Sequence, residues 1–206
     1  MPLPFVSTNK LLRHLLEQMS VVRDQTTKYI NEKTTSEWQW SPGTGTWSAI
    51  QCLEHLNTYG RYYLPALEKT ISAAENAGSR PYAEFSSSFL GAYFTRLMLP
   101  GNQGQLRFRM KSPWKHLPST QPAVADVLAE FLLQQERMEK LLRRAYAANI
   151  QDYKVPTSLF SLVRLSVGDT FGFLVAHIQR HLLQVEKALA GNELPAHGMS
   201  STLMVW

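Results

Sequence analysis

Four segments of the chain repeat apolar residues every three or four positions, which is the spacing of one buried face of an α-helix. These segments cover residues 8–31, 46–78, 122–149 and 166–189. In the first of them the repeating positions are Leu11, Leu12, Leu15, Met19 and Val22. Long amphipathic helices bury their apolar faces by packing together, so the pattern predicts an all-α protein built as a four-helix bundle.

The segments between these helices predict connections and short extra helices. Residues 32–46 carry a Pro-Gly turn and should simply join the first two long helices. Residues 79–122 form a long cross-connection, with a short helix expected over Glu84–Leu99. Another short helix is expected over Ser158–Leu165. No stretch alternates apolar and polar residues, so no β-strand is expected.

The composition fits a single domain over residues 1–206. Hydrophobic residues make up 44% of the chain and charged residues 18%, which is enough apolar material for one sizeable core. No run approaches the roughly 18 apolar residues of a membrane-spanning helix, and the start of the chain lacks a signal-peptide pattern. Cys52 is the only cysteine, which excludes an intramolecular disulfide and fits a reducing compartment. We therefore expect a cytoplasmic protein with no membrane partner.

A net charge of +5 raises the question of nucleic-acid binding. The basic residues are scattered along helix surfaces, except for a short run that contains Arg107, Arg109 and Lys111. The chain shows no helix-turn-helix, zinc-finger or RNA-binding pattern, so no nucleic-acid partner is expected. Arg107 and Arg109 could instead bind an acidic group of a substrate, or they could lie on a solvated loop.

Two histidines on the last helix suggest a metal site. His177 and His181 are four residues apart on an apolar stripe, so their side chains share one helix face. His55 lies on the inner stripe of the second helix and is the best candidate for a third ligand. Three histidines with an open coordination position are typical of catalytic zinc, and nickel or iron also accept imidazole. Alternatively, the histidines are buried and hydrogen-bonded without a metal.

Neighbouring residues limit the chemistry of such a site. His14, His116 and His197 occupy a helix edge, a loop and the tail, which are poorer positions for a ligand. Ile178 stands where the zinc-protease motif has its glutamate base, which argues against a protease mechanism. Tyr59, one turn after His55, could contact a substrate or simply pack in the core. Cys52 could be a fourth ligand or a buried apolar residue.

The two histidine segments resemble motifs of the DinB-like superfamily. Trp47–Leu56 (WSAIQCLEHL) is similar to the family signature in which Trp-Ser precedes His-Leu, and His177–His181 (HIQRH) is similar to its second motif, H-x-x-R-H. Glu37–Pro42 resembles the lead-in to the first motif, and residues 108–113 and 154–168 resemble connecting segments of one branch. The resemblance covers nearly the whole chain.

The resemblance implies a four-helix bundle in which His55, His177 and His181 hold a divalent metal ion, with zinc or nickel as the expected ions. Characterised members of the family include S-transferases and isomerases that use low-molecular-weight thiols such as bacillithiol or mycothiol, and dimers are common among them. Other members are described as metal-dependent hydrolases. The resemblance therefore implies a small-molecule substrate and a capacity to form a homodimer.

Three functions remain open at this stage. In a metal-dependent thiol S-transferase, which we expect first, the ion would lower the pKa of a bound thiol. In a metal-dependent hydrolase the ion would activate water, but this chemistry needs a base and Glu54 points about 100° around the helix from His55. The third function is a non-catalytic metal-binding bundle, for which a closed four-ligand site is typical.

Overall fold

The protein is a mainly helical bundle in the computed structural model, which describes residues 4–100, 111–158 and 162–191. The α-helices of this part are α1 (Thr8–Glu32), α2 (Thr35–Gln39), α3 (Ala49–Asn76), α4 (Phe89–Met98), α5 (Val124–Arg144) and α6 (Val167–Leu189). The short elements are the strands β1 (Phe5–Ser7), β2 (Glu84–Ser86), β3 (Lys154–Pro156) and β4 (Arg164–Ser166) and the 3₁₀ turns η2 (Trp114–His116) and η3 (Ala145–Ala147).

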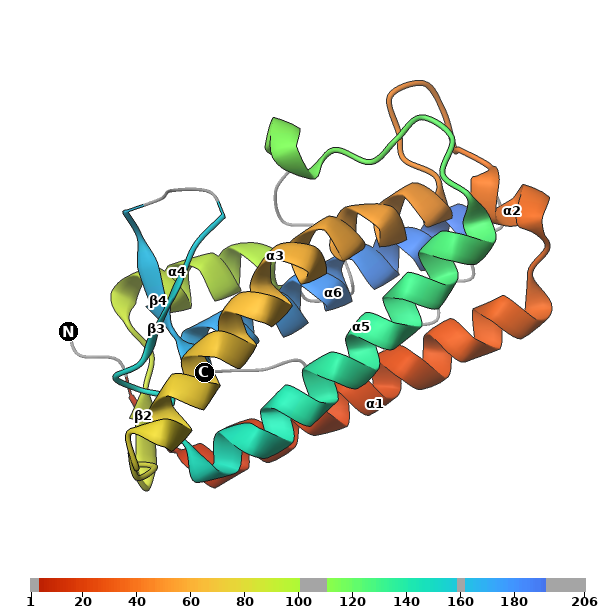
Figure 1. Cartoon of the computed structure of the whole chain (residues 1–206). Coiled ribbons are helices and arrows are strands. Elements are labelled where there is room, and N and C mark those ends of the chain that lie inside the picture. The colour runs from red at the N-terminus through yellow and green to blue at the C-terminus, as the bar shows by residue number, and fades with distance from the viewer. Residues whose placement is uncertain (1–3, 101–110, 159–161, 192–206) are drawn as a thin grey trace.

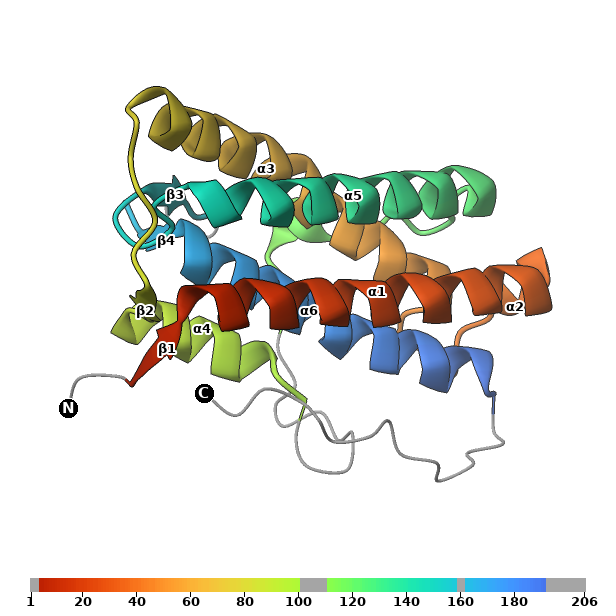
Figure 2. The same ribbon diagram turned by 90° about the horizontal axis from the view of Figure 1, so that it is seen from below.

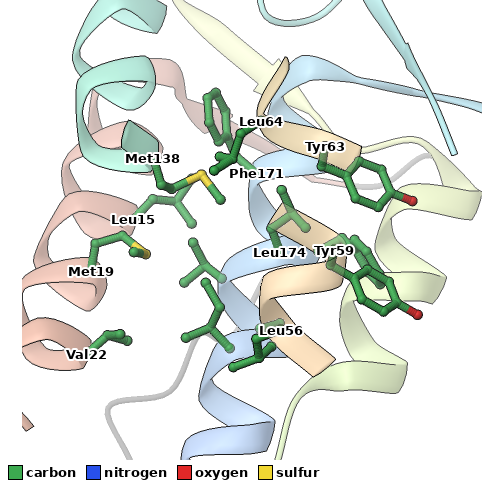
Figure 3. Packing of buried hydrophobic residues seen from close by; sticks show 14 of the residues in the cluster. Leu15, Met19, Val22, Leu56, Tyr59, Tyr63, Leu64, Met138, Phe171 and Leu174 are labelled. Atoms are coloured by element: carbon green, nitrogen blue, oxygen red, sulfur yellow. The ribbon is translucent and has the colours of Figure 1, made fainter. Parts of the chain in front are cut away.

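The four long helices α1, α3, α5 and α6 form the bundle, as predicted (Figure 1). Helices α1 and α3 each pack against both α5 and α6, and α4 packs against α6 (Figure 2). Apolar side chains from all four long helices meet in one core. Figure 3 shows Leu15 and Met19 of α1 facing Met138 of α5, with Leu64 of α3 and Leu174 of α6 beside them.

Side-chain caps fix the starts of the two helices that carry the clustered histidines. The Ser48 side chain accepts a hydrogen bond from the Gln51 backbone N–H at 3.3 Å, and the Gln51 side chain accepts one from the Ser48 N–H at 3.0 Å, so the two residues form a capping box. At α6, the Ser166 side chain accepts from the Asp169 N–H at 3.0 Å. The Asp169 carboxylate accepts hydrogen bonds from the hydroxyl groups of Ser87 and Ser88, and these bonds connect α6 to the start of α4.

Several predictions about the connections are wrong. The chain contains two small antiparallel strand pairs, β1 with β2 and β3 with β4. The helix expected over Glu84–Leu99 therefore begins as a strand and becomes helical only at Phe89. The described end of Ser158–Leu165 belongs to strand β4, while residues 159–161 lie outside the described part. These strands are three residues long, too short to show an alternating pattern in the sequence.

Helix α2 was also missed, because residues 32–46 were expected to be only a connection. Its signal was present in the sequence as Thr34 with Glu37 three residues later, and the structure shows both hydrogen bonds of a capping box there. No helix in the described part is long and apolar enough to cross a membrane. A single domain over residues 1–206 stays a prediction.

Candidate metal centre

Three buried histidines converge between α3 and α6. His55 comes from α3, and His177 and His181 come from α6 one turn apart. One ring nitrogen from each lies within 4.8 Å of the others, and the Nε2 atoms of His55 and His177 are 3.2 Å apart. All three side chains are at least 95% buried. The structure thus brings together the three residues that the sequence singled out as ligands.

A backbone hydrogen bond orients the His55 ring. Its Nδ1–H donates to the carbonyl oxygen of His116 at 2.6 Å, because a carbonyl can only accept. The proton of the neutral ring is therefore on Nδ1, and Nε2 carries a free lone pair. That lone pair faces His177 and His181, which is the arrangement a metal ligand needs.

His116 itself is held in place by its ring. The Thr58 hydroxyl donates its one proton to the His55 carbonyl at 2.7 Å, so at 2.9 Å it can only accept from Nδ1–H of His116. The other ring nitrogen of His116, Nε2, then accepts from the Ser158 hydroxyl at 2.9 Å. Tyr59 stacks on the same ring with the centroids 3.9 Å apart. His116 is buried and supports His55 through its backbone.

Sequence reasoning missed this role, since His116 was set aside as a loop residue in a poor position for a ligand. The structure agrees that its ring is not part of the three-histidine cluster. Its contribution comes from a carbonyl group on a segment about 60 residues away along the chain. No local spacing pattern reports such a contact.

Aromatic side chains form the wall of the cluster. Trp47 lies against His55 and His181, with ring centroids 4.9 and 6.1 Å apart. Phe173 stacks on His177 at 5.7 Å. Tyr59 presents its ring to His177 at 4.4 Å and to His55 at 5.1 Å, and burial raises the pKa of its hydroxyl. Tyr59, predicted to contact a substrate, therefore borders the site, while Arg107 and Arg109 lie outside the described residues.

Burial keeps the three imidazoles neutral. It lowers the pKa of His55 from its usual 6.5 to about 4, against a smaller opposing effect of the bond to the His116 carbonyl. Burial, followed by the charge of the neighbouring histidines, holds the pKa values of His177 and His181 well below the usual range. Neutral imidazole is the form that binds metal ions.

The geometry of the cluster fits a divalent ion. In a tetrahedral zinc site with Zn–N bonds of about 2.0–2.1 Å, two nitrogen ligands lie about 3.3–3.4 Å apart. The 3.2 Å between Nε2 of His55 and Nε2 of His177 is close to that value. Side chains from two helices would then supply three nitrogen ligands and leave the fourth coordination position of the ion open. Nickel accepts the same ligand type.

Residues 18–185 of the chain match the family model of the DinB superfamily. The chain belongs to the DinB superfamily. The matched span includes all three clustered histidines and both motifs that suggested the resemblance. No curated protein and no solved structure matches the chain significantly.

Two residues of this DinB-superfamily chain that were considered for the site, Glu54 as a base and Cys52 as a fourth ligand, lie outside the three-histidine cluster. Glu54 turns away and accepts hydrogen bonds from the Ser119 backbone N–H at 2.7 Å and from the Ser119 hydroxyl. Cys52 is buried, which raises its thiol pKa to about 12, and its Sγ lies 3.9 Å from the side-chain oxygen of Gln184. Within the described residues, neither a carboxylate nor a thiol joins the three histidines.

Proposed function

We propose that His55, His177 and His181 bind one divalent ion, zinc or nickel, and that the protein is a metal-dependent thiol S-transferase. The observation that carries the proposal is the convergence of three neutral imidazoles, which no carboxylate of the described residues joins. Three protein ligands with an open position are typical of catalytic metal sites, whereas structural zinc sites have four protein ligands. Membership of the DinB superfamily supports the metal-binding part of the proposal.

The ion, once bound, would lower the pKa of a coordinated low-molecular-weight thiol and so favour its reactive thiolate form. The three imidazoles are neutral and leave the two positive charges of the ion uncompensated, which favours an anionic fourth ligand. Trp47, Tyr59 and Phe173 would exclude water and offer an apolar wall to the electrophilic substrate. In the transfer, the thiol proton goes to solvent, sulfur forms a bond to the electrophilic carbon, and the leaving group departs with its electron pair.

The alternative functions receive less support from the described residues. A hydrolase needs a group that takes a proton from water, and the nearest candidate in sequence, Glu54, is bound to Ser119 instead. A purely structural metal site would need a fourth protein ligand, and the Cys52 thiol is not in the cluster. Both remain outcomes of the test.

Metal binding is tested first, on protein purified without a polyhistidine tag. Elemental analysis should find about one zinc or nickel ion per chain in the wild type and almost none in His177→Ala. His14→Ala is the matched control because it removes a histidine that is not in the cluster. Equal metal content in His177→Ala and wild type would overturn the proposed site.

Thiol transfer is tested next. The metal-loaded protein is incubated with a panel of low-molecular-weight thiols and an electrophile such as monobromobimane, and formation of the thioether is followed. We expect turnover that a chelator abolishes and that is lost in His177→Ala. Hydrolysis of ester or amide substrates without thiol consumption would instead favour the hydrolase.

A further inference from the structure

A narrow cavity lies behind His177, between α3, α5 and α6. Its lining includes Tyr59 and Gly60 of α3, Gln135 and Met138 of α5, and His177 of α6. It leaves about 20 Å³ for the centres of water molecules. Since roughly 10–15 Å³ of such space is enough for one water, the cavity can hold about one.

Two residues of this lining each carry a buried polar atom that has no hydrogen-bond partner among the described residues. The atoms are Nδ1 of His177 and the side-chain oxygen Oε1 of Gln135. Both side chains are 3% exposed, so bulk water does not satisfy them. Most of the other lining residues are apolar, and an unsatisfied buried polar group costs about 1–3 kcal/mol. Such pairs are usually bridged by an ordered water.

The cavity is linked to metal binding through the choice of which ring nitrogen of His177 carries the proton. His55 Nε2 is an acceptor, because the His55 proton is on Nδ1. In the metal-free protein, His177 therefore satisfies the 3.2 Å contact by donating from its own Nε2–H. A metal ion would need the lone pair of that nitrogen, so the proton of His177 would have to be on Nδ1, the buried atom that has no hydrogen-bond partner among the described residues.

We propose that Gln135 is a positioning residue for the metal centre, and that a water held in the cavity links Nδ1–H of the metal-binding His177 tautomer to Oε1 of Gln135. This inference rests on the proposed metal site. The water would accept from Nδ1–H and donate to Oε1, which satisfies both atoms. Hydrogen-bonded partners of metal-binding histidines fix the tautomer and ring orientation, and their loss typically lowers metal affinity 10- to 100-fold.

The test measures zinc affinity by competition with a chromophoric chelator. Gln135→Met, which keeps the length of the side chain but cannot hydrogen-bond, should bind zinc 10- to 100-fold more weakly. Gln135→Glu keeps an acceptor at this position and should bind at least as tightly as the wild type. Met138→Leu alters the apolar lining of the same cavity and should keep wild-type affinity.

Thermal unfolding of the metal-free proteins separates this role from a structural one. Gln135→Met should be as stable as the wild type without metal, because Oε1 makes no hydrogen bond with any residue in the described part of the chain. In the zinc-loaded wild type, NMR should detect a slowly exchanging proton on Nδ1 of His177, a readout that does not depend on any variant folding.

Four results would overturn the inference. They are zinc affinity of Gln135→Met within twofold of the wild type, equally weak binding by Gln135→Glu, a similar loss in Met138→Leu, or no protected Nδ1 proton. In each case the wild type still binds zinc, so the proposed metal site survives. A wild type that binds no zinc would overturn both proposals.

Discussion

Mild acid should destabilise the metal-free protein steeply, because three buried histidines must stay neutral in the fold. The pKa of His55 is lowered to about 4, and those of His177 and His181 lie well below 6.5, chiefly through burial. In the unfolded chain the same residues titrate near 6.5. Below that pH the unfolded state binds more protons than the folded state, so stability falls as the pH falls.

The magnitude follows from the number of histidines. A histidine that is protonated only when unfolded costs about 1.4 kcal/mol at pH 5.5, one unit below its unfolded pKa. The three clustered residues together should therefore cost about 4 kcal/mol between pH 7.5 and 5.5, a large share of the roughly 5–15 kcal/mol of a typical domain. Burial raises the pKa of Glu186, which offsets part of this loss near the acid end. Burial also lowers the pKa of His116, which adds to the loss. The carboxylates with lowered pKa values, such as Glu37 at about 2, titrate below this window.

The assay is urea unfolding in the presence of EDTA at pH 7.5, 6.5 and 5.5. The three cluster histidines should account for about 4 kcal/mol of lost unfolding free energy over this range, to which His116 adds and from which Glu186 subtracts. His177→Gln removes one of the three histidines and should lose about 1.4 kcal/mol less than the wild type. NMR should also show no titration of the three cluster histidines in the folded protein above pH 5.5. A wild-type loss below about 1 kcal/mol, or cluster histidines that titrate near 6.5, would refute the reasoning.

Three further predictions concern the supports of the site. Gly91→Ala would place a Cβ against the carboxyl group of Asp169, so either α4 or the hydrogen-bonded Asp169 side chain must shift. Thermal unfolding should show a loss of about 1–3 kcal/mol, which the unobstructed Gly43→Ala does not show. Ser48→Ala removes the N-cap of α3 and should cost about 1 kcal/mol in urea unfolding, and an unchanged midpoint would contradict the role of the cap. His116→Phe loses both ring hydrogen bonds that hold the His116 carbonyl beside His55. Chelator competition should show about a tenfold loss of zinc affinity. Wild-type affinity in this variant would show that the ring is dispensable.

The long helices could be predicted from the sequence because each carries its own signal. A buried face repeats every three or four residues whatever the helix packs against, so the four long segments were found to within a few residues. The capping box at Ser48 and Gln51 is equally local. The short strands could not be predicted from a local pattern, because a three-residue strand is defined by the strand with which it pairs. Val6, for example, is extended because it pairs with Phe85, almost 80 residues later.

The clustered histidines were found for a related reason. His177 and His181 share a helix face by spacing alone, and imidazole on an apolar stripe is unusual enough to be noticed. His55 was chosen as the third ligand because it lies on the inner stripe of the second helix, and the resemblance of its segment to a family motif then implied the same role. The spatial relation between α3 and α6 could not be derived from either helix by itself. Arg107 and Arg109 remain predictions, because they lie outside the described residues.

The groups that orient the candidate metal site could not be predicted from a residue pattern, because their chemistry is not specific to a residue type. His55 is oriented by the carbonyl of His116, and every residue of the chain carries such a carbonyl. Gln135 is one of two adjacent glutamines on α5, and it is distinguished by being buried in the lining of a cavity that His177 also lines. A sequence can therefore reveal the atoms that would bind a metal, since few side chains can do so. The atoms that set the tautomers of those ligands are identified only when the fold places them, and the zinc affinities of the Gln135 variants test that placement directly.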